Sequence, residues 1–172
     1  MSLSADDIIK LLDLQPPTTC GYVSEPYRSP VQIPQLALPA GFVGSRSLGN
    51  VYYFLVTPDA RVRLHRIRSD QMYHHYLGNP LEVLLLYADG RHEVRTVGTD
   101  LAAGERPQLF IPGGTFHTAR VPAGGDYALL GTSVFLRAEP PDVEVGDTEL
   151  LVNTYPAARA NIREFAAGPA GG

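Results

Sequence analysis

Residues 108–121 read QLFIPGGTFHTARV and hold the pattern that decides the fold. Two short runs of strand-forming residues, Gln108–Ile111 and His117–Val121, flank the turn sequence Pro112-Gly113-Gly114. Proline and glycine supply turn conformations that other residues adopt less easily. The segment therefore predicts two β-strands joined by a tight turn, with His117 at the start of the second strand.

The same pattern extends outward in both directions. Further β-rich runs are Val51–Thr57, Val62–Ile67, Met72–Leu77, Leu81–Tyr87, Glu93–Val97 and Tyr127–Phe135. The segments between them contain turn residues and leave no room for a crossover helix, so neighbouring strands should be antiparallel. We therefore expect an all-β fold, an antiparallel double-stranded β-helix of the jelly-roll type, with its barrel core at residues 50–136.

Helices are predicted only near the two ends of a single domain that covers residues 1–172. Ser4 and Asp7 form the signature of a capping box, which predicts an N-terminal helix that Pro16 and Pro17 end. Prolines recur through the rest of residues 1–49, which favours edge strands and an extended arm. Helical segments are expected again over residues 143–166.

Composition excludes several classes of protein. The net charge is −4 and the basic residues are scattered, so we expect no nucleic-acid partner. The apolar runs are too short to span a membrane. Cys20 is the only cysteine, which excludes an internal disulfide and favours a reducing compartment, so we predict a cytoplasmic protein.

Four of the five histidines lie in two short stretches, with His65, His74 and His75 in the first and His117 in the second. Side chains alternate between the two faces of a strand, so His65 should share a face with Ile67. On the next run, Gln71, Tyr73 and His75 should share a face. Clustered histidines on paired strands favour metal binding or proton transfer.

These residues stand at motif positions of a known family. His65, Gln71 and Gly78 have the spacing of the first cupin motif, and residues 112–117 match the Pro-x-Gly-x-x-His core of the second. The chain therefore resembles the cupin superfamily. It resembles most a small-cupin subfamily catalogued as a domain of unknown function, over residues 7–165. The stretches that carry this closer resemblance are Tyr27–Ser29, His65–Asp70, Gly78–Glu82 and Gly104–Gln108.

The resemblance implies a pocket inside the barrel, with His65 and His117 on its wall. Metal-binding cupins supply three histidines and a glutamate, and here Ile67 and Gln71 stand at two of those positions. His75 could add a third imidazole, so the implied metal ligands are His65, Gln71, His75 and His117. The cofactor is then one divalent ion (Zn, Fe, Ni or Mn), or there is none. An amide neutralises none of the ion's charge, which makes Gln71 a poorer ligand than a carboxylate.

Without a metal, His65 or His117 could act as a general base, with Tyr73 or Tyr53 as the proton donor. We predict His65, His117 and Tyr73 as catalytic residues. The predicted substrate-binding residues are Tyr53, Arg28, Gln71 and Glu82. Arg28 could clamp an anion. Glu82 needs a partner or a function because it interrupts an apolar strand, and an ion pair with a nearby arginine is the plainer interpretation.

Two classes of function are consistent with these residues. The first is an enzyme acting on a small organic molecule, with isomerase, epimerase or cyclase chemistry by proton transfer or metal assistance, and with a substrate from specialised metabolism. A metal-dependent dioxygenase is a variant of it. The second is a non-catalytic cupin that binds a small molecule. In either case we expect a homodimer that uses the N-terminal arm to cover apolar surface.

Overall fold

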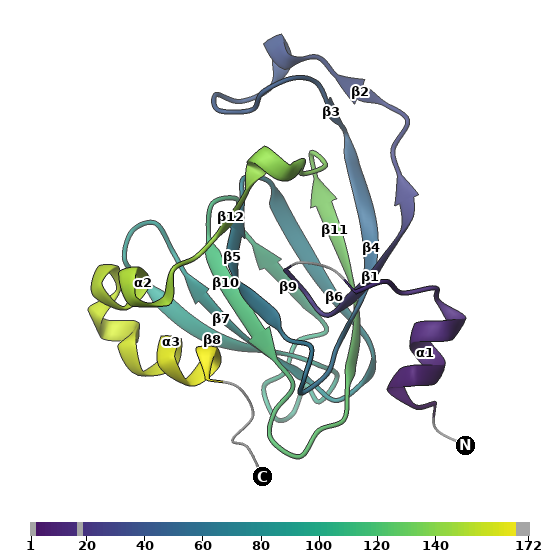
Figure 1. Cartoon of the computed structure of the whole chain (residues 1–172), viewed down its shortest axis with the longest axis vertical. Coiled ribbons are helices and arrows are strands. Elements are labelled where there is room, and N and C mark those ends of the chain that lie inside the picture. Colours follow the sequence, from purple (N-terminus) through teal and green to yellow (C-terminus); the bar gives the residue numbers. More distant parts are fainter. Residues whose placement is uncertain (1–2, 17–18, 168–172) are drawn as a thin grey trace.

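A computed structural model describes residues 3–16 and 19–167, and ten of its strands form two facing antiparallel sheets (Figure 1). The first sheet has the order β1-β4-β11-β6-β9 and the second the order β12-β5-β10-β7-β8. The first consists of β1 (Tyr22–Arg28), β4 (Gly49–Val56), β11 (Ala128–Phe135), β6 (Asp70–Gly78) and β9 (Gln108–Ile111). The second consists of β12 (Val143–Val145), β5 (Val62–Ile67), β10 (Phe116–Arg120), β7 (Leu81–Leu86) and β8 (His92–Val97). The predicted antiparallel jelly roll is confirmed.

The main core lies between the two sheets and follows from strand alternation. Phe54 and Leu130 point inward from the first sheet, and Val83 and Leu85 point inward from the second. All four are at most 1% exposed. Burial of such side chains stabilises the fold by about 1.5–3 kcal/mol each. This packing holds the two sheets together and defines the space that remains between them.

Helices cover the outer face of each sheet. α1 (Ala5–Leu11) lies on the first sheet, where Ile8 packs with Leu55 and Leu129. α2 (Thr148–Thr154) and α3 (Arg159–Ala166), joined by η3 (Pro156–Ala158), cover the second sheet, as Figure 1 shows. Their apolar faces bury the outer residues of β5, β7 and β10, which are Leu64, Leu84, Leu86 and Phe116. Within the described residues, no helix has the length and apolar character needed to cross a membrane.

Two predictions near the chain ends need correction. The N-terminal helix has the expected Ser4–Asp7 capping box but ends at Leu11, so Pro16 does not end it, and Pro17 lies outside the described residues. Residues 143–166 are not helical throughout, because Val143–Val145 form β12 and pair with β5. The pairing of Val145 with His65 makes this strand a neighbour of the predicted site.

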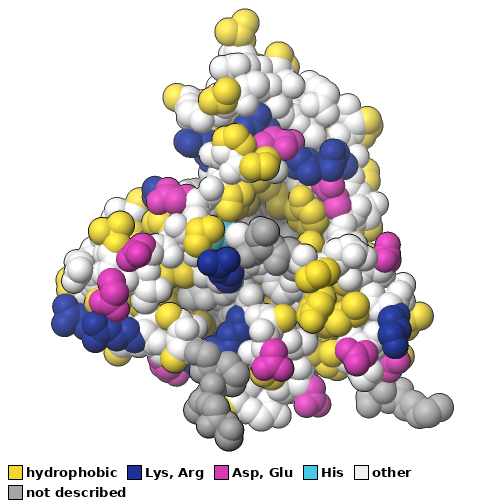
Figure 2. All heavy atoms as spheres, in the orientation of Figure 1, with side chains coloured by type: hydrophobic (Ala, Val, Ile, Leu, Met, Phe, Trp, Pro, Cys, Tyr) yellow, Lys and Arg dark blue, Asp and Glu magenta, His cyan; other side chains and the backbone are white. Residues whose placement is uncertain are grey.

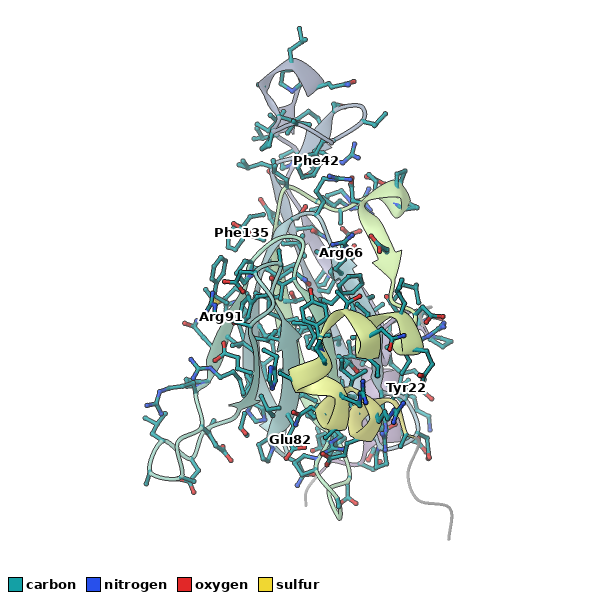
Figure 3. All side chains as sticks on the ribbon, turned by 90° about the vertical axis from the view of Figure 1, so that its left-hand side faces the viewer. Tyr22, Phe42, Arg66, Glu82, Arg91 and Phe135 are labelled. Atoms are coloured by element: carbon teal, nitrogen blue, oxygen red, sulfur yellow. The ribbon has the colours of Figure 1, made fainter. Side chains whose placement is uncertain are left out.

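The N-terminal arm projects beyond the barrel (Figure 1). It contains β2 (Gln32–Ile33), η1 (Gln35–Ala37) and β3 (Arg46–Ser47). Phe42 anchors it, with the guanidinium groups of Arg46 and Arg68 lying 5.6 and 5.8 Å from its ring centroid. Arg46 also pairs with Asp142 at 2.9 Å, in the short η2 (Pro140–Asp142), where both side chains are buried. Figure 3 shows Phe42 inside this arm, above the barrel.

The turn between β9 and β10 fixes the start of the second histidine strand. Gly114 has a φ of 79°, a left-handed conformation that favours glycine. Its N–H donates to the Ile67 carbonyl at 2.7 Å, and the Gly113 N–H donates to the Asp70 carboxylate at 2.7 Å. The turn is thereby tied to the end of β5, which sets the register between His65 and His117.

Candidate functional site

Cross-strand pairing places a row of hydroxyl groups on the inner face of the first sheet. Thr132 on β11 pairs with Tyr52 on β4 and with Tyr73 on β6. Residues that pair directly across antiparallel strands point to the same face. The row Tyr52, Thr132 and Tyr73 therefore presents three hydroxyl groups toward the second sheet.

On the second sheet, two imidazole side chains lie opposite this hydroxyl row. His65 on β5 pairs directly with His117 on β10, and their ring centroids lie 4.3 Å apart with the planes tilted by 53°. Each Nδ1 bonds to a carbonyl two residues earlier, at 2.7 Å to Arg63 and 3.2 Å to Thr115. Because a carbonyl only accepts, each Nδ1 carries the proton and each Nε2 has a free lone pair in the neutral ring.

A cavity of about 220 Å³ lies between the hydroxyl row and His65. His65, Gln71, Tyr73, Tyr52 and Thr132 all contribute to its wall. The rest of the wall is Thr19, Cys20, Val23, Phe54, Ile67, Val134, Ala138 and Val143. Ligand pockets commonly measure about 300–1,000 Å³, so this one suits a small molecule. On the face seen in Figure 2, hydrophobic side chains gather around a hollow below the arm, and a histidine side chain is visible in it.

A larger hollow of about 340 Å³ shares Ile67 and Val143 with this cavity, but its charged groups pair with one another. Arg66 pairs with Glu144 at 2.6 Å, and Arg68 lies 3.7 Å from Asp142. Both pairs include exposed side chains, so water screens the attraction between their charges. We therefore place the candidate site in the inner cavity, where polar groups are buried and converge.

His117 lies behind the cavity wall and does not contribute to it. Its side chain is 0% exposed, and its Nε2 has no hydrogen-bond partner among the described residues. The ring packs against His65 and, at a centroid distance of 6.0 Å, against Tyr73. His117 therefore positions the two residues that do reach the cavity.

Burial keeps the titratable groups of the site neutral. Desolvation lowers the pKa of His65, against the opposing effect of its hydrogen bond to the Arg63 carbonyl. Desolvation lowers the pKa of His117 well below its usual value, and the charge of a protonated His65 nearby would lower it further. Burial raises the pKa of the Tyr73 phenol strongly, and it raises the pKa of the Cys20 thiol to about 11. At neutral pH the site therefore presents neutral imidazole, phenol and thiol groups.

Two of the predicted residues lie away from the cavity because of local strand geometry. Tyr53 points to the outer face of the first sheet, where it packs beneath α1, and its neighbour Tyr52 takes the inner position. His75 follows Gln71 by four residues, which is about 13 Å along a strand at about 3.3 Å per residue. Its Nε2 bonds to the Asn79 carbonyl at 2.9 Å, at the other end of β6.

The predicted charged residues are held in ion pairs outside the cavity. Arg28 is exposed and pairs with Glu25 on the same strand. Glu82 pairs with Arg120 at 2.9 Å, and Figure 3 shows Glu82 on the outside of the barrel near the C-terminal helices. Glu82 therefore has the structural ion pair that its sequence context suggested, and neither residue contacts the cavity.

Sequence reasoning missed Tyr52 and Thr132, although a signal for both was present. Phe54 and Val56 alternate as buried residues in β4, which places Tyr52 on the same inner face. Leu130 and Val134 do the same for Thr132 in β11. Alternation counted from the buried residues of each strand would have selected Tyr52 in place of Tyr53.

The donor groups at the cavity do not fit a divalent metal of the cupin type. In the described part of the chain, no group of three His, Cys, Asp or Glu side chains is arranged to hold an ion. His65 and His117 are adjacent, but His75 is not with them, Ile67 stands at a ligand position and Gln71 offers only an amide. Two imidazoles without a carboxylate leave the charge of Zn, Fe, Ni or Mn unneutralised in a buried site.

A family model described as "Cupin superfamily (DUF985)" matches residues 6–136. The chain belongs to this cupin family. The matched residues include the first sheet's central strands, His65, His117 and the Pro112–Gly114 turn, whereas the wall residues Ala138 and Val143 lie beyond the match. A search of curated proteins found no match.

Solved structures share the fold of this chain over most of its length. This cupin matches a hypothetical protein from Leishmania major with a TM-score of 0.85 and 27% identity, covering 95% of this chain and 99% of that one. It matches a protein from Shewanella oneidensis with a TM-score of 0.82 and 28% identity, covering 96% and 99%. A Bacillus subtilis oxalate decarboxylase with Mn(II) centers matches at a TM-score of 0.51 and 14% identity, covering 89% and 37%. The last likeness shows the fold alone.

Proposed function

We propose that this cupin binds a small organic molecule between its two sheets and moves a proton on it, in an isomerase-, epimerase- or cyclase-type reaction. The observation that carries the proposal is that His65 and Tyr73 come from opposite sheets and line one cavity. A base and a hydrogen-bond donor on opposite sides of a bound molecule are the two groups that enolisation of a carbonyl compound requires.

His65 is the proposed base. Its Nδ1–H is held by the Arg63 carbonyl, so Nε2 is the atom that can accept a proton. Burial lowers the pKa of His65, which keeps Nε2 unprotonated at neutral pH. In the proposed step, Nε2 removes a proton from a carbon beside the substrate carbonyl and returns it to the same or a neighbouring carbon, so no proton is gained or lost overall.

Tyr73 is the proposed partner of the substrate oxygen. Burial raises its pKa strongly, so loss of the phenol proton is costly. Tyr73 therefore stays protonated and donates a hydrogen bond to the oxygen on which negative charge develops. This role replaces the full proton transfer that the sequence suggested for it, and no step of the reaction needs a metal-bound intermediate.

The test is deuterium incorporation in D₂O, followed by NMR over a panel of small ketones, aldehydes and lactones. Compounds with acidic C–H groups should exchange faster with the protein than without it. The His65→Gln variant should lose this acceleration by about 10²–10⁴-fold, the range expected for removal of a general base. His74→Gln is the matched control, because His74 lies on the outer face and bonds to Ser133 at 3.1 Å. Equal exchange by the wild type and His65→Gln would contradict the proposal.

Non-catalytic binding is the second candidate function. The predominantly apolar wall, with Val23, Phe54, Ile67 and Val134 among its residues, favours retention of a small molecule by itself. A binding protein would hold its ligand in the wild type and in His65→Gln without accelerating proton exchange in either. A dioxygenase has less support, because the donor groups at the cavity lack the carboxylate and third imidazole that the sequence comparison implied.

A further inference from the structure

The cavity wall contains no ionisable acid or base of the Asp, Glu, Lys or Arg type among the described residues that line it. Charged residues do neighbour the wall in sequence, since Arg66 and Arg68 flank Ile67, but they and the residues that flank Val143 do not line it and are paired as described above. After β11, Ala138 lines the wall and its neighbour Arg137 does not. Arg137 pairs with Glu25 at 2.9 Å and also with Glu139. These charges compensate one another outside the cavity and are not directed at a ligand.

An anion in this space would therefore lose its hydration without gaining a counter-charge. Burial of an unpaired carboxylate is unfavourable even after the protein relaxes around it. His65 makes the environment less favourable still, because its Nδ1–H is committed to Arg63 and its Nε2 presents a lone pair. The hydrogen-bond donors that remain are neutral: the Thr19 hydroxyl and the Cys20 thiol, which contact each other, and the groups of Tyr52, Tyr73, Thr132 and Gln71.

Thr132 supplies a second, independent observation. Its side chain is 8% exposed, and its Oγ1 is buried without a hydrogen-bond partner among the described residues. The hydroxyl lies on the cavity wall, between Tyr52 and Tyr73 in the cross-strand row. A buried hydroxyl without a partner destabilises the folded protein, and a valine of nearly the same shape would avoid that cost. The position therefore indicates a partner that enters the cavity.

We propose that the cavity binds an uncharged organic molecule with a carbonyl or hydroxyl oxygen, and that the Thr132 hydroxyl hydrogen-bonds that oxygen. A carbonyl oxygen has two lone pairs, so Thr132 and its neighbour Tyr73 can donate to the same atom. Carboxylates, phosphates and nucleotide sugars are excluded as ligands of this site. The inference rests on the proposed function only for the location of the ligand.

Matched probes test the charge selectivity. Benzaldehyde, benzyl alcohol, benzamide and benzoate share one ring and differ in a single group, and only benzoate is ionised at neutral pH. Affinities measured by NMR titration of the histidine Cε1–H signals should be at least about tenfold tighter for the best neutral probe than for benzoate, which corresponds to about 1.4 kcal/mol. Equal or tighter binding of benzoate, or binding of none of the neutral probes, would overturn the inference.

The Thr132→Val variant tests the role of the hydroxyl. It should bind the best neutral probe about fivefold more weakly, while its stability to urea stays equal or rises. Ser133→Ala, on the outer face of the same strand, should leave the affinity unchanged. Unchanged affinity in Thr132→Val, or a loss of stability that shows a structural partner for the hydroxyl, would overturn the assignment.

The two proposals fail in different ways. Neutral probes that bind without any His65-dependent deuterium exchange would contradict proton transfer and leave the ligand class standing. His65-dependent exchange on anionic compounds only would contradict the ligand class and leave proton transfer standing.

Discussion

At the scale of single residues, the site depends on which face of a strand each side chain occupies. The alternation that starts from Ile67 correctly places His65 inward, and the alternation of β6 correctly places Gln71 and Tyr73 on one inner face. The sequence could not show that His117 lies one layer behind His65. That arrangement depends on the pairing of β5 with β10, which brings together residues separated by some fifty positions.

The buried imidazoles predict how stability depends on pH. Burial lowers the pKa of both His65 and His117 from the ordinary value of 6.5, so the unfolded chain binds protons at a higher pH than the folded protein does. The stability from keeping these rings neutral is therefore present above pH 6.5 and is lost as the pH falls from there toward the folded-state values. Urea unfolding across this range should show that the free energy of unfolding falls more steeply with pH in the wild type than in His117→Leu, because leucine cannot bind a proton. If the two free energies fell in parallel, His117 would not be the cause of the pH dependence.

At the scale of elements, short turns and pairings bring the site residues together. The eight strands expected between residues 50 and 136 form with small shifts at their ends, because turn residues separate them clearly. β12 was missed since Val143–Val145 is too short for a periodic pattern, and it becomes a strand only by pairing with the edge of β5. Its first residue, Val143, closes one side of the cavity.

The turn between β9 and β10 gives a prediction at this scale. A Cβ on Gly113 would lie 2.2 Å from the Arg68 carbonyl oxygen, a backbone atom that cannot move aside, whereas a Cβ on Gly114 would meet nothing within 4 Å. Gly114→Ala should therefore cost only the left-handed backbone penalty, about 1–2 kcal/mol. Gly113→Ala should cost more and should also weaken binding in the cavity, because it separates the turn from the end of β5. Denaturant unfolding measures both, and an equal loss in the two variants would contradict this account.

At the scale of the whole molecule, the composition and strand pattern were enough to predict the architecture but not the order of strands within each sheet. That order depends on contacts between distant segments, such as β4 with β11 and β5 with β10. From the sequence we expected a second copy to cover the apolar outer surface, but α1 covers part of the first sheet and α2 and α3 cover the second. The arm is different, because Leu36 and Val43 are 101% and 70% exposed.

This exposed arm supports the prediction of a homodimer. Exposed apolar side chains in an ordered, projecting segment favour contact with another molecule, and a second copy is always available. Leu36→Glu with Val43→Glu should shift the protein from dimer to monomer in light scattering coupled to size-exclusion chromatography. Leu101→Glu is the matched control, since Leu101 is 61% exposed but lies in the turn after β8, and it should leave the mass unchanged. A monomeric wild type across micromolar concentrations would contradict the prediction.

We expect a neutral molecule to bind between the hydroxyl row and His65. A crystal structure of the protein with its tightest neutral probe tests this binding site. The probe should lie inside the cavity, with its oxygen within hydrogen-bonding distance of Tyr73 or Thr132 and a carbon facing His65 Nε2. A probe seated in the larger hollow beside Arg66, or an inner cavity that holds a carboxylate or a metal ion in its place, would contradict this expectation.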